Sequence, residues 1–234
     1  MANPLLFVPL TVTGSIAVVL LPDISALAVK NDYTTLNKRV DLGMNFSFLI
    51  CGLVMGLFLS LGEELTSFLY GDTESGKYLS VAAFSMLPMC LSQMSQSILN
   101  SVGKEKQAFF SFLAGNACML VLIYVLPKYV GIYGMAIATC ASYLVDGTIN
   151  CVLLHKKTGW GRNAIKYLVL SVLFSLICAF FTLSLRSLTG ALAPFLSLFI
   201  KGFCCVVSYA TLCAGAGLID INLFWALCKK KKAR

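Results

Sequence analysis

Residues 133–154 read YGMAIATCASYLVDGTINCVLL, an apolar run long enough to cross a membrane that nevertheless carries an acid, Asp146, in its interior. On a helical wheel at about 100° per residue, the polar side chains of this run gather in an arc of about 100°. They are Thr139, Ser142, Tyr143, Asp146 and Asn150. The pattern predicts a membrane helix whose polar stripe faces protein or water rather than lipid.

The composition of the whole chain agrees with a membrane protein. Of its 234 residues, 59% are hydrophobic and 12% are charged, and the mean hydropathy is +0.86. Soluble domains have about 45–50% apolar and about 25% charged residues. Because so few charges cannot cover a soluble surface, the sequence predicts an all-α integral membrane fold that is embedded in a lipid bilayer.

Seven apolar stretches have about the length of a membrane span. They are 5–29, 44–61, 78–99, 109–126, 133–154, 167–185 and 196–218. We expect residues 1–155 to form a bundle of five spans. Residues 156–234 would then add two C-terminal spans and a basic cytoplasmic tail.

The basic residues follow the predicted loops in alternation. Most of the 18 Lys and Arg residues fall in every second loop: Lys30, Lys38, Arg39, Lys104, Lys106, Lys156, Lys157, Arg162, Lys166, Lys229–Lys232 and Arg234. Positive residues concentrate in cytoplasmic loops, so the N-terminus is predicted outside and the C-terminus inside the cell. Topology therefore explains the net charge of +8, and we expect no nucleic-acid partner.

Two prolines and three amides are candidates for conformational change or cargo contact. Pro22 predicts a helix end at the cytoplasmic interface, or alternatively a gate hinge. Pro88 lies inside the third span, where a structural kink and a transport hinge are equal alternatives. Gln93, Gln96 and Asn100 recur at helical spacing on one face, so they either join helices or line a cavity.

The sequence shows no pattern typical of a metal or catalytic site. Nine of the cysteines lie inside apolar runs, no Cys-x-x-Cys pair occurs, and His155 is the only histidine. We therefore expect no metal, no resident cofactor and no enzyme. Lys104 and Lys106 follow Gly103 in a predicted cytoplasmic turn. They either only set the membrane orientation, as basic loop residues do, or also contact a lipid pyrophosphate.

Four segments carry a resemblance to a known family: VLLPDIS at 19–25, GEELTSFLYG at 62–71, SQSILNSVGK at 95–104 and LPKYVGIYG at 126–134. In this order they resemble the oligosaccharide flippase branch of the multidrug/oligosaccharidyl-lipid/polysaccharide exporter superfamily, in particular its stage V sporulation protein B type. Members of that branch have about fourteen helices in two lobes, and this chain resembles the second lobe plus two extra helices.

The resemblance implies a transporter in a bacterial cell membrane that moves a polyprenyl-linked oligosaccharide, a precursor of wall, polysaccharide or spore cortex, by alternating access. It also implies a partner, the N-terminal lobe, that this sequence does not contain. A cation-coupled multidrug exporter and a truncated, non-transporting fragment are the alternatives. An integral-membrane lipid-phosphate transferase is disfavoured, because it would need paired cytoplasmic acids to hold Mg²⁺.

The sequence leaves three interpretations of Asp146 open. It can join its helix to a neighbour, bind a coupling proton or sodium ion, or pair with a base in the absent lobe. No base in the predicted spans is well placed for it, since Lys201 is expected near the outer end of its helix with its ammonium group reaching the interface.

Overall fold

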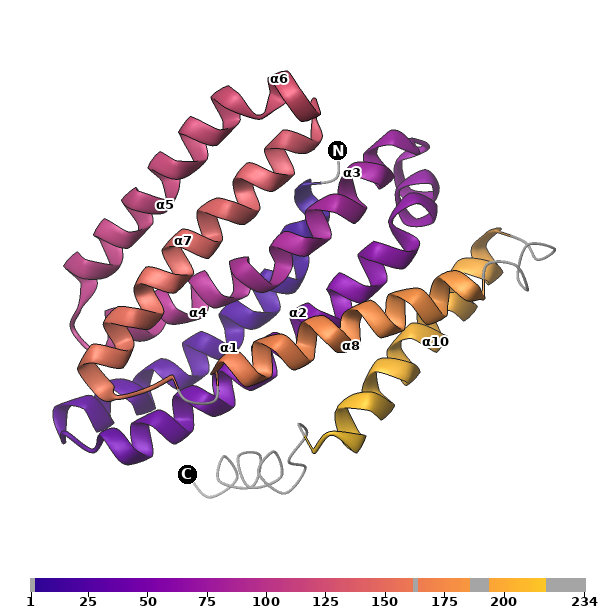
Figure 1. Ribbon diagram of the computed structural model, residues 1–234. Helices are drawn as coiled ribbons and strands as arrows, with labels where there is room; N and C mark the ends of the chain where they lie inside the picture. The colour runs from indigo at the N-terminus through magenta and orange to yellow at the C-terminus, as the bar shows by residue number, and fades with distance from the viewer. Residues whose placement is uncertain (1–2, 162–163, 186–193, 218–234) are drawn as a thin grey trace.

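The computed structural model describes residues 3–161, 164–185 and 194–217, and every element within these ranges is helical (Figure 1). The all-α prediction is therefore confirmed. The helices are α1 (Asn3–Val29), α2 (Tyr33–Tyr70), α3 (Glu74–Ala82), the 3₁₀ turn η1 (Ala83–Ser85), α4 (Met86–Ser101), α5 (Glu105–Val125), α6 (Pro127–Val130), α7 (Tyr133–Thr158), α8 (Ala164–Ser184) and α10 (Pro194–Gly215). The predicted basic tail at 229–234 lies outside the described residues.

Six of these helices are long and apolar enough to cross a membrane: α1, α2, α5, α7, α8 and α10. The chain is thus a multi-pass membrane protein. The third predicted span, 78–99, is not a single helix, because it is divided into α3, η1 and α4. Helices α3, η1 and α4 together cover the third predicted span, and the interruption falls beside Pro88, where the sequence predicts a kink.

Pro88 explains the division of the third span. A proline has no N–H to donate to the carbonyl four residues earlier, which here belongs to Phe84 in η1. The thiol of Cys140, on α7, lies 3.9 Å from that carbonyl oxygen and can donate to it. A neighbouring helix thus contacts the backbone group that Pro88 leaves free, and a hinge function of Pro88 stays a prediction.

Pro22 does not end its helix, so the predicted terminator is wrong. Helix α1 continues through Pro22 to Val29, and the Ser25 hydroxyl donates to the Pro22 carbonyl at 3.0 Å. Proline removes one backbone hydrogen bond, and membrane helices tolerate this loss where neighbours hold the helix in place. Here Leu20 and Ile24, on either side of Pro22, are both buried against the bundle.

Helix α2 is much longer than the predicted span 44–61. Its 38 residues extend about 57 Å at about 1.5 Å per residue, against about 30 Å of hydrocarbon. The helix therefore includes residues 33–43, which the hydropathy pattern assigned to a loop. Its first turn begins at Asp32, whose carboxylate accepts from the Thr35 N–H at 3.1 Å and the Thr34 hydroxyl at 2.7 Å.

These bonds predict a pH dependence of folding. Hydrogen bonds from Thr35 and Thr34 lower the pKa of Asp32 to about 2, below the value of about 3.9 for an unfolded chain. The carboxylate therefore stabilises the fold fully above about pH 4, and this contribution disappears as the pH falls through 2. We expect Asp32→Asn to flatten the fall in melting temperature between about pH 4 and pH 2. An unchanged profile would contradict the capping role.

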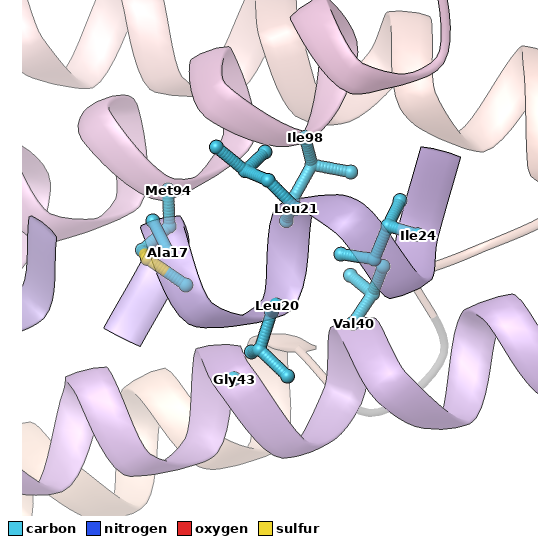
Figure 2. Close-up of a pocket in the computed structure, with 8 residues that line it drawn as sticks. All are labelled: Ala17, Leu20, Leu21, Ile24, Val40, Gly43, Met94 and Ile98. Carbon is cyan, nitrogen blue, oxygen red and sulfur yellow. The ribbon is translucent and has the colours of Figure 1, made fainter. Parts of the chain in front are cut away.

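Helix α2 packs against α1, α3 and α4, and also against α8 and α10. It therefore joins the C-terminal helices α8 and α10 to the rest of the bundle. Figure 2 shows one junction, where Leu20 and Ile24 of α1 meet Gly43 and Val40 of α2. Leu21 of α1 lies beside Ile98 of α4 in the same view. A Cβ on Gly43 would lie 2.5 Å from Leu20 Cδ1, so an alanine at this position would require the Leu20 side chain to move. All the residues that line this junction are apolar.

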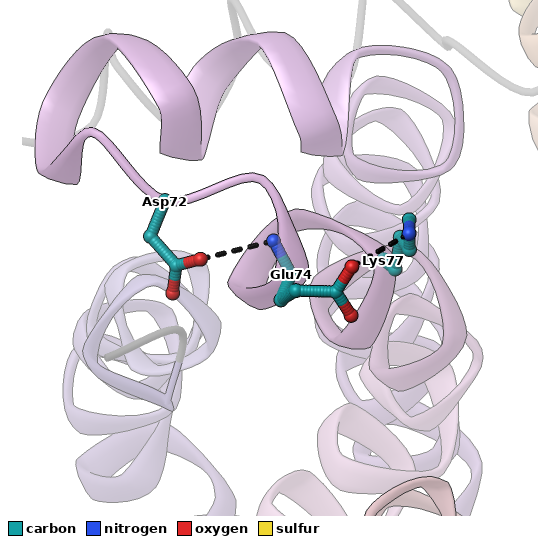
Figure 3. Close-up of polar contacts among 3 residues, drawn as sticks. All are labelled: Asp72, Glu74 and Lys77. Atoms are coloured by element: carbon teal, nitrogen blue, oxygen red, sulfur yellow. Dashed lines mark hydrogen bonds and ion pairs between the residues drawn. The ribbon is translucent and has the colours of Figure 1, made fainter.

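The turn between α2 and α3 is held by local polar contacts (Figure 3). Asp72 accepts from the Glu74 N–H at 3.0 Å and from the Ser75 hydroxyl, which lowers the pKa of the Asp72 carboxyl. The Lys77 ammonium lies 2.7 Å from Glu74, and this hydrogen bond raises the pKa of Lys77. The contacts are exposed, so they define the turn more than they stabilise the fold.

Helices α8 and α10 form a second core with α2, built around Leu49, Cys178, Cys205, Tyr209 and Cys213. The approach is closest at Gly52 of α2, where an added Cβ would lie 2.4 Å from the Tyr209 hydroxyl. The Ser175 hydroxyl of α8 donates to the Gly52 carbonyl at 2.6 Å. Helices α5 and α7 lie on the other side of the molecule (Figure 1).

The turn between α7 and α8 is attached to the start of α2. The indole N–H of Trp160, which is 2% exposed, donates to Asp41 at 2.7 Å. The Asn37 amide donates to the Thr158 carbonyl at 2.8 Å. His155 Nδ1 lies 2.7 Å from the Trp160 carbonyl, and since a carbonyl only accepts, this nitrogen carries a hydrogen.

Candidate transport site

Asp146 lies near the middle of α7, where it is 3% exposed between three helices. Its carboxylate accepts from the Ser92 hydroxyl of α4 at 2.5 Å and from the Asn150 amide at 3.0 Å. The Asn150 carbonyl in turn accepts from the Ser111 hydroxyl of α5. These four side chains, which we call the Asp146 cluster, connect α4, α5 and α7 by a chain of hydrogen bonds.

Two glycines bring the backbones close enough for this chain. A Cβ on Gly115 of α5 would lie 2.9 Å from the Ser142 carbonyl oxygen and 3.0 Å from Asp146 Cβ. A Cβ on Gly147 of α7 would lie 3.2 Å from the Ser92 nitrogen. Small residues at membrane helix contacts permit such an approach, so the short side chains of Ser92 and Ser111 can reach α7.

The structure separates the predicted site residues into two groups. Ser142, Asp146 and Asn150 are all buried in the contact with α4 and α5. Gln93 instead faces α1, where its amide oxygen lies 3.4 Å from the Thr13 hydroxyl. The polar stripe of 133–154 thus faces protein, as the sequence predicts, but it does not share a surface with the amides of the third span.

The remaining candidates lie at or near the same end of α4. Gln96 is half-buried and Asn100 is exposed on the face that also carries Gln93. The turn that follows contains Gly103, with φ 75°, then Lys104, which is half-buried, and Lys106, which is exposed. Both lysines can therefore contact a lipid phosphate at this end of the bundle, or serve as basic loop residues.

The structure reveals an ion pair that the sequence interpretation missed. The Lys201 ammonium of α10 lies 2.6 Å from the Glu64 carboxylate of α2. The Lys201 side chain is 5% exposed and that of Glu64 is 29% exposed, so the predicted extension of Lys201 to the interface is wrong. A signal was present, because Lys201 is a base within an apolar span and GEE at 62–64 was expected at the same side of the membrane.

Ser92 and Ser111 were also missed. Serine hydroxyls in membrane helices commonly bond to their own backbone, so their sequence positions carry no distinctive signal. Only the pairing of helices shows that Ser92 faces Asp146 and that Ser111 faces Asn150.

An apolar groove of about 460 Å³ lies between α2 and α10. Its lining consists of Leu57, Phe58, Leu61, Leu65, Phe195, Leu198, Phe199, Gly202, Phe203 and Val206. The lining contains no charged residue, which suits a hydrocarbon chain better than a polar group. Among the residues described, no group of three or more His, Cys, Asp or Glu side chains is placed to hold a metal ion.

Comparison with known proteins gives the family. Residues 2–203 match the family described as "Lipid II flippase MurJ". The lipid II flippase MurJ of Bacillus subtilis (strain 168) is 25% identical over 180 residues, which cover 74% of this chain and 33% of that protein. No solved structure matches the chain. With most of its length matched by one family, this chain belongs to the MurJ family of lipid II flippases.

Proposed function

We propose that this chain is the second helical lobe of a flippase that moves a polyprenyl-linked oligosaccharide across a bacterial plasma membrane by alternating access. The observation that carries the proposal is the family match over residues 2–203, in a chain that has six candidate spanning helices. Membership of a flippase family also supports a transporter rather than an enzyme, because flipping a lipid breaks no covalent bond. The apolar groove between α2 and α10 is compatible with a lipid-linked cargo.

The partner lobe is part of this proposal. The chain matches about a third of the length of its curated relative. We propose that helices corresponding to the unmatched part complete the transporter, since alternating access moves one lobe against the other. They can belong to the same polypeptide or to a separate one.

The proposed orientation places the ends of α1, α4 and α7 in the cytoplasm. Together with the starts of α2, α5 and α8, these ends carry eight of the eleven described basic residues. The Lys157 ammonium, at the end of α7, lies 5.8 Å from the centre of the Tyr33 ring, at the start of α2. Lys77 lies in α3 and Lys128 in the short α6, near the opposite ends of the long helices. Basic residues are therefore concentrated at one end of the bundle, which supports a cytoplasmic location for that end.

The finer predictions about cargo and coupling stay proposals. We propose a cargo of the wall, polysaccharide or spore cortex precursor class, as for the stage V sporulation protein B type, with a proton or sodium ion as the only coupling species. A cation-coupled multidrug exporter is less well supported, since the matching family is described by a lipid cargo.

Transport of a labelled lipid tests the function. The chain, together with the helices that complete it, would be reconstituted in vesicles that contain fluorescent lipid II. We expect a membrane-impermeant quencher to reach more of the label than in protein-free vesicles, because flipping exposes lipid from the inner leaflet. Quenching equal to that of protein-free vesicles would contradict the proposal.

For Asp146 we propose the packing role, because its bonds to Ser92 and Asn150 join α7 to α4 within a closed cluster. Asp146→Asn is then expected to lower the melting temperature while transport keeps its pH profile. Ser60→Ala serves as a matched control, because the Ser60 hydroxyl bonds only within its own helix, to the Gly56 and Leu57 carbonyls. A shifted pH profile in Asp146→Asn with normal stability would favour the coupling role instead.

A further inference from the structure

We propose that the first half of helix α10, residues 194–204, is a movable segment that the ion pair of Glu64 and Lys201 latches to α2. The second half, residues 205–213, stays packed and serves as the pivot. The latch sets the width of the apolar groove between α2 and α10. The inference goes beyond the proposed function, because it concerns the position of a helix and holds for any cargo.

The second half of α10 is closely packed on α2 and α8. Tyr209, in the second core, is 4% exposed, and its hydroxyl would lie 2.4 Å from a Cβ added to Gly52 of α2. On the α8 side, the Ser208 hydroxyl lies 3.5 Å from the thiol of Cys178. Separating such a contact would forfeit many dispersion contacts at once, so this half of the helix keeps its place.

The first half of α10 meets α2 across a gap. The apolar groove of about 460 Å³ lies between the two helices, and its lining on α10 comes from residues 195–206. A Cβ added to Gly202 would meet only Leu61 Cδ1, at 3.9 Å, so the two backbones do not approach closely there. Phe199 and Phe203 are 66% and 63% exposed. Apolar packing therefore contributes little to the position of this half, since side chains beside a gap lose their partner atoms.

Two contacts hold the first half against α2. The Lys201 ammonium lies 2.6 Å from the Glu64 carboxylate, and the ring centroids of Phe195 and Phe68 are 5.8 Å apart. The ring contact is replaceable, because lipid chains can cover both rings equally well. The ion pair is not replaceable, because the Lys201 side chain is 5% exposed and a buried ammonium without its carboxylate is strongly unfavourable.

The state without the latch follows from the same chemistry. When Glu64 carries no charge, the Lys201 ammonium must find polar surroundings elsewhere. A long basic side chain in a membrane helix does this by reaching the interface, and here that requires α10 to move or rotate away from α2. The packed half at Tyr209 limits the movement to residues 194–204. Loss of the pair therefore opens the groove without releasing the whole helix.

Two engineered cross-links in the full chain, held in lipid nanodiscs, measure the two halves separately. Phe68→Cys with Phe195→Cys reports the first half, and a short bifunctional methanethiosulfonate bridges the two thiols. Ser208→Cys reports the second half, because its thiol would face the native Cys178 and form a disulfide under mild oxidation. Mass spectrometry identifies each cross-linked peptide, so the other native cysteines can remain.

In a Glu64→Gln background we expect the first cross-link to form at least about fivefold more slowly, because losing the latch raises the open population. The Ser208→Cys cross-link is expected to keep its rate. Glu74→Gln breaks an exposed pair and is the matched control, which should change neither rate. Exchanging the charges, with Glu64→Lys and Lys201→Glu together, should restore the first rate.

The two rates together decide the inference. If both rates stay unchanged in Glu64→Gln, the pair is not a latch and the inference is overturned. Equal slowing of both would also overturn it, because the whole helix would then detach or the protein would unfold. Slowing that is confined to the pair of Phe68 and Phe195 supports the inference. None of these results depends on lipid II flipping, so failure here leaves the proposed function intact.

Discussion

Replacing Glu64 with glutamine is expected to lower the free energy of unfolding by about 3 kcal/mol, the lower end of the range for a broken buried ion pair. Lys201, whose side chain is 5% exposed, would then keep its charge without a partner. The lower end applies because Glu64 itself is 29% exposed and water can reach it. Chemical denaturation in detergent, followed by circular dichroism, would measure the change.

The exposed pair of Glu74 and Lys77 provides the control. Their side chains are 74% and 48% exposed, so Glu74→Gln is expected to leave stability nearly unchanged. Exchanging the two charges, with Glu64→Lys and Lys201→Glu together, should recover much of the stability lost in Glu64→Gln. If Glu64→Gln proves as mild as Glu74→Gln, the buried pair does not hold α10 to α2.

Replacing Gly76 with alanine is expected to destabilise the protein by about 1–3 kcal/mol through overpacking. The new Cβ would lie 2.4 Å from Glu63 Cα and 2.9 Å from the Glu63 nitrogen, both backbone atoms of α2. Backbone cannot rotate out of the way, so α3 must move away from α2. The higher helix propensity of alanine, worth up to about 1 kcal/mol, would only partly offset this.

Gly202→Ala is the matched control, since Gly202 lies within α10 and an added Cβ would meet only Leu61 Cδ1, at 3.9 Å. That contact is ordinary, so the propensity of alanine should make this variant neutral or slightly more stable. Thermal unfolding of the two variants side by side measures the contrast. A Gly76→Ala protein as stable as Gly202→Ala would show that α2 and α3 are packed less closely than the structure indicates.

Two errors in the predicted helices come from local signals, hydropathy in one case and a proline in the other. Hydropathy reports where lipid surrounds a helix, whereas helix length depends on backbone bonds and caps that continue into water. Residues 33–43 are polar enough to predict a loop, yet they continue α2 from the cap at Asp32. Pro22 was expected to end α1, but the packing of Leu20 and Ile24 maintains the helix on both sides of it.

The sequence predicted which residues of α7 take part in the candidate site, but not which residues of other helices they contact. The wheel of 133–154 identified Asp146 and Asn150 as facing protein, which the structure bears out. Their partners Ser92 and Ser111 could not be predicted, because each belongs to another helix. The same limit concealed the pairing of Lys201 with Glu64, residues that are 137 positions apart.

The sequence by itself determined the class of the protein, the approximate spans, the basic end of the bundle and the polar stripe of α7. Each of these follows from composition or from periodicity within one segment. Only the tertiary structure decided that the Asp146 cluster is closed while the amides of α4 are open, and that Glu64 neutralises Lys201. The physical reason is that burial and charge pairing depend on which helices meet, and helix contacts in a membrane are set by close packing of small residues that hydropathy does not register.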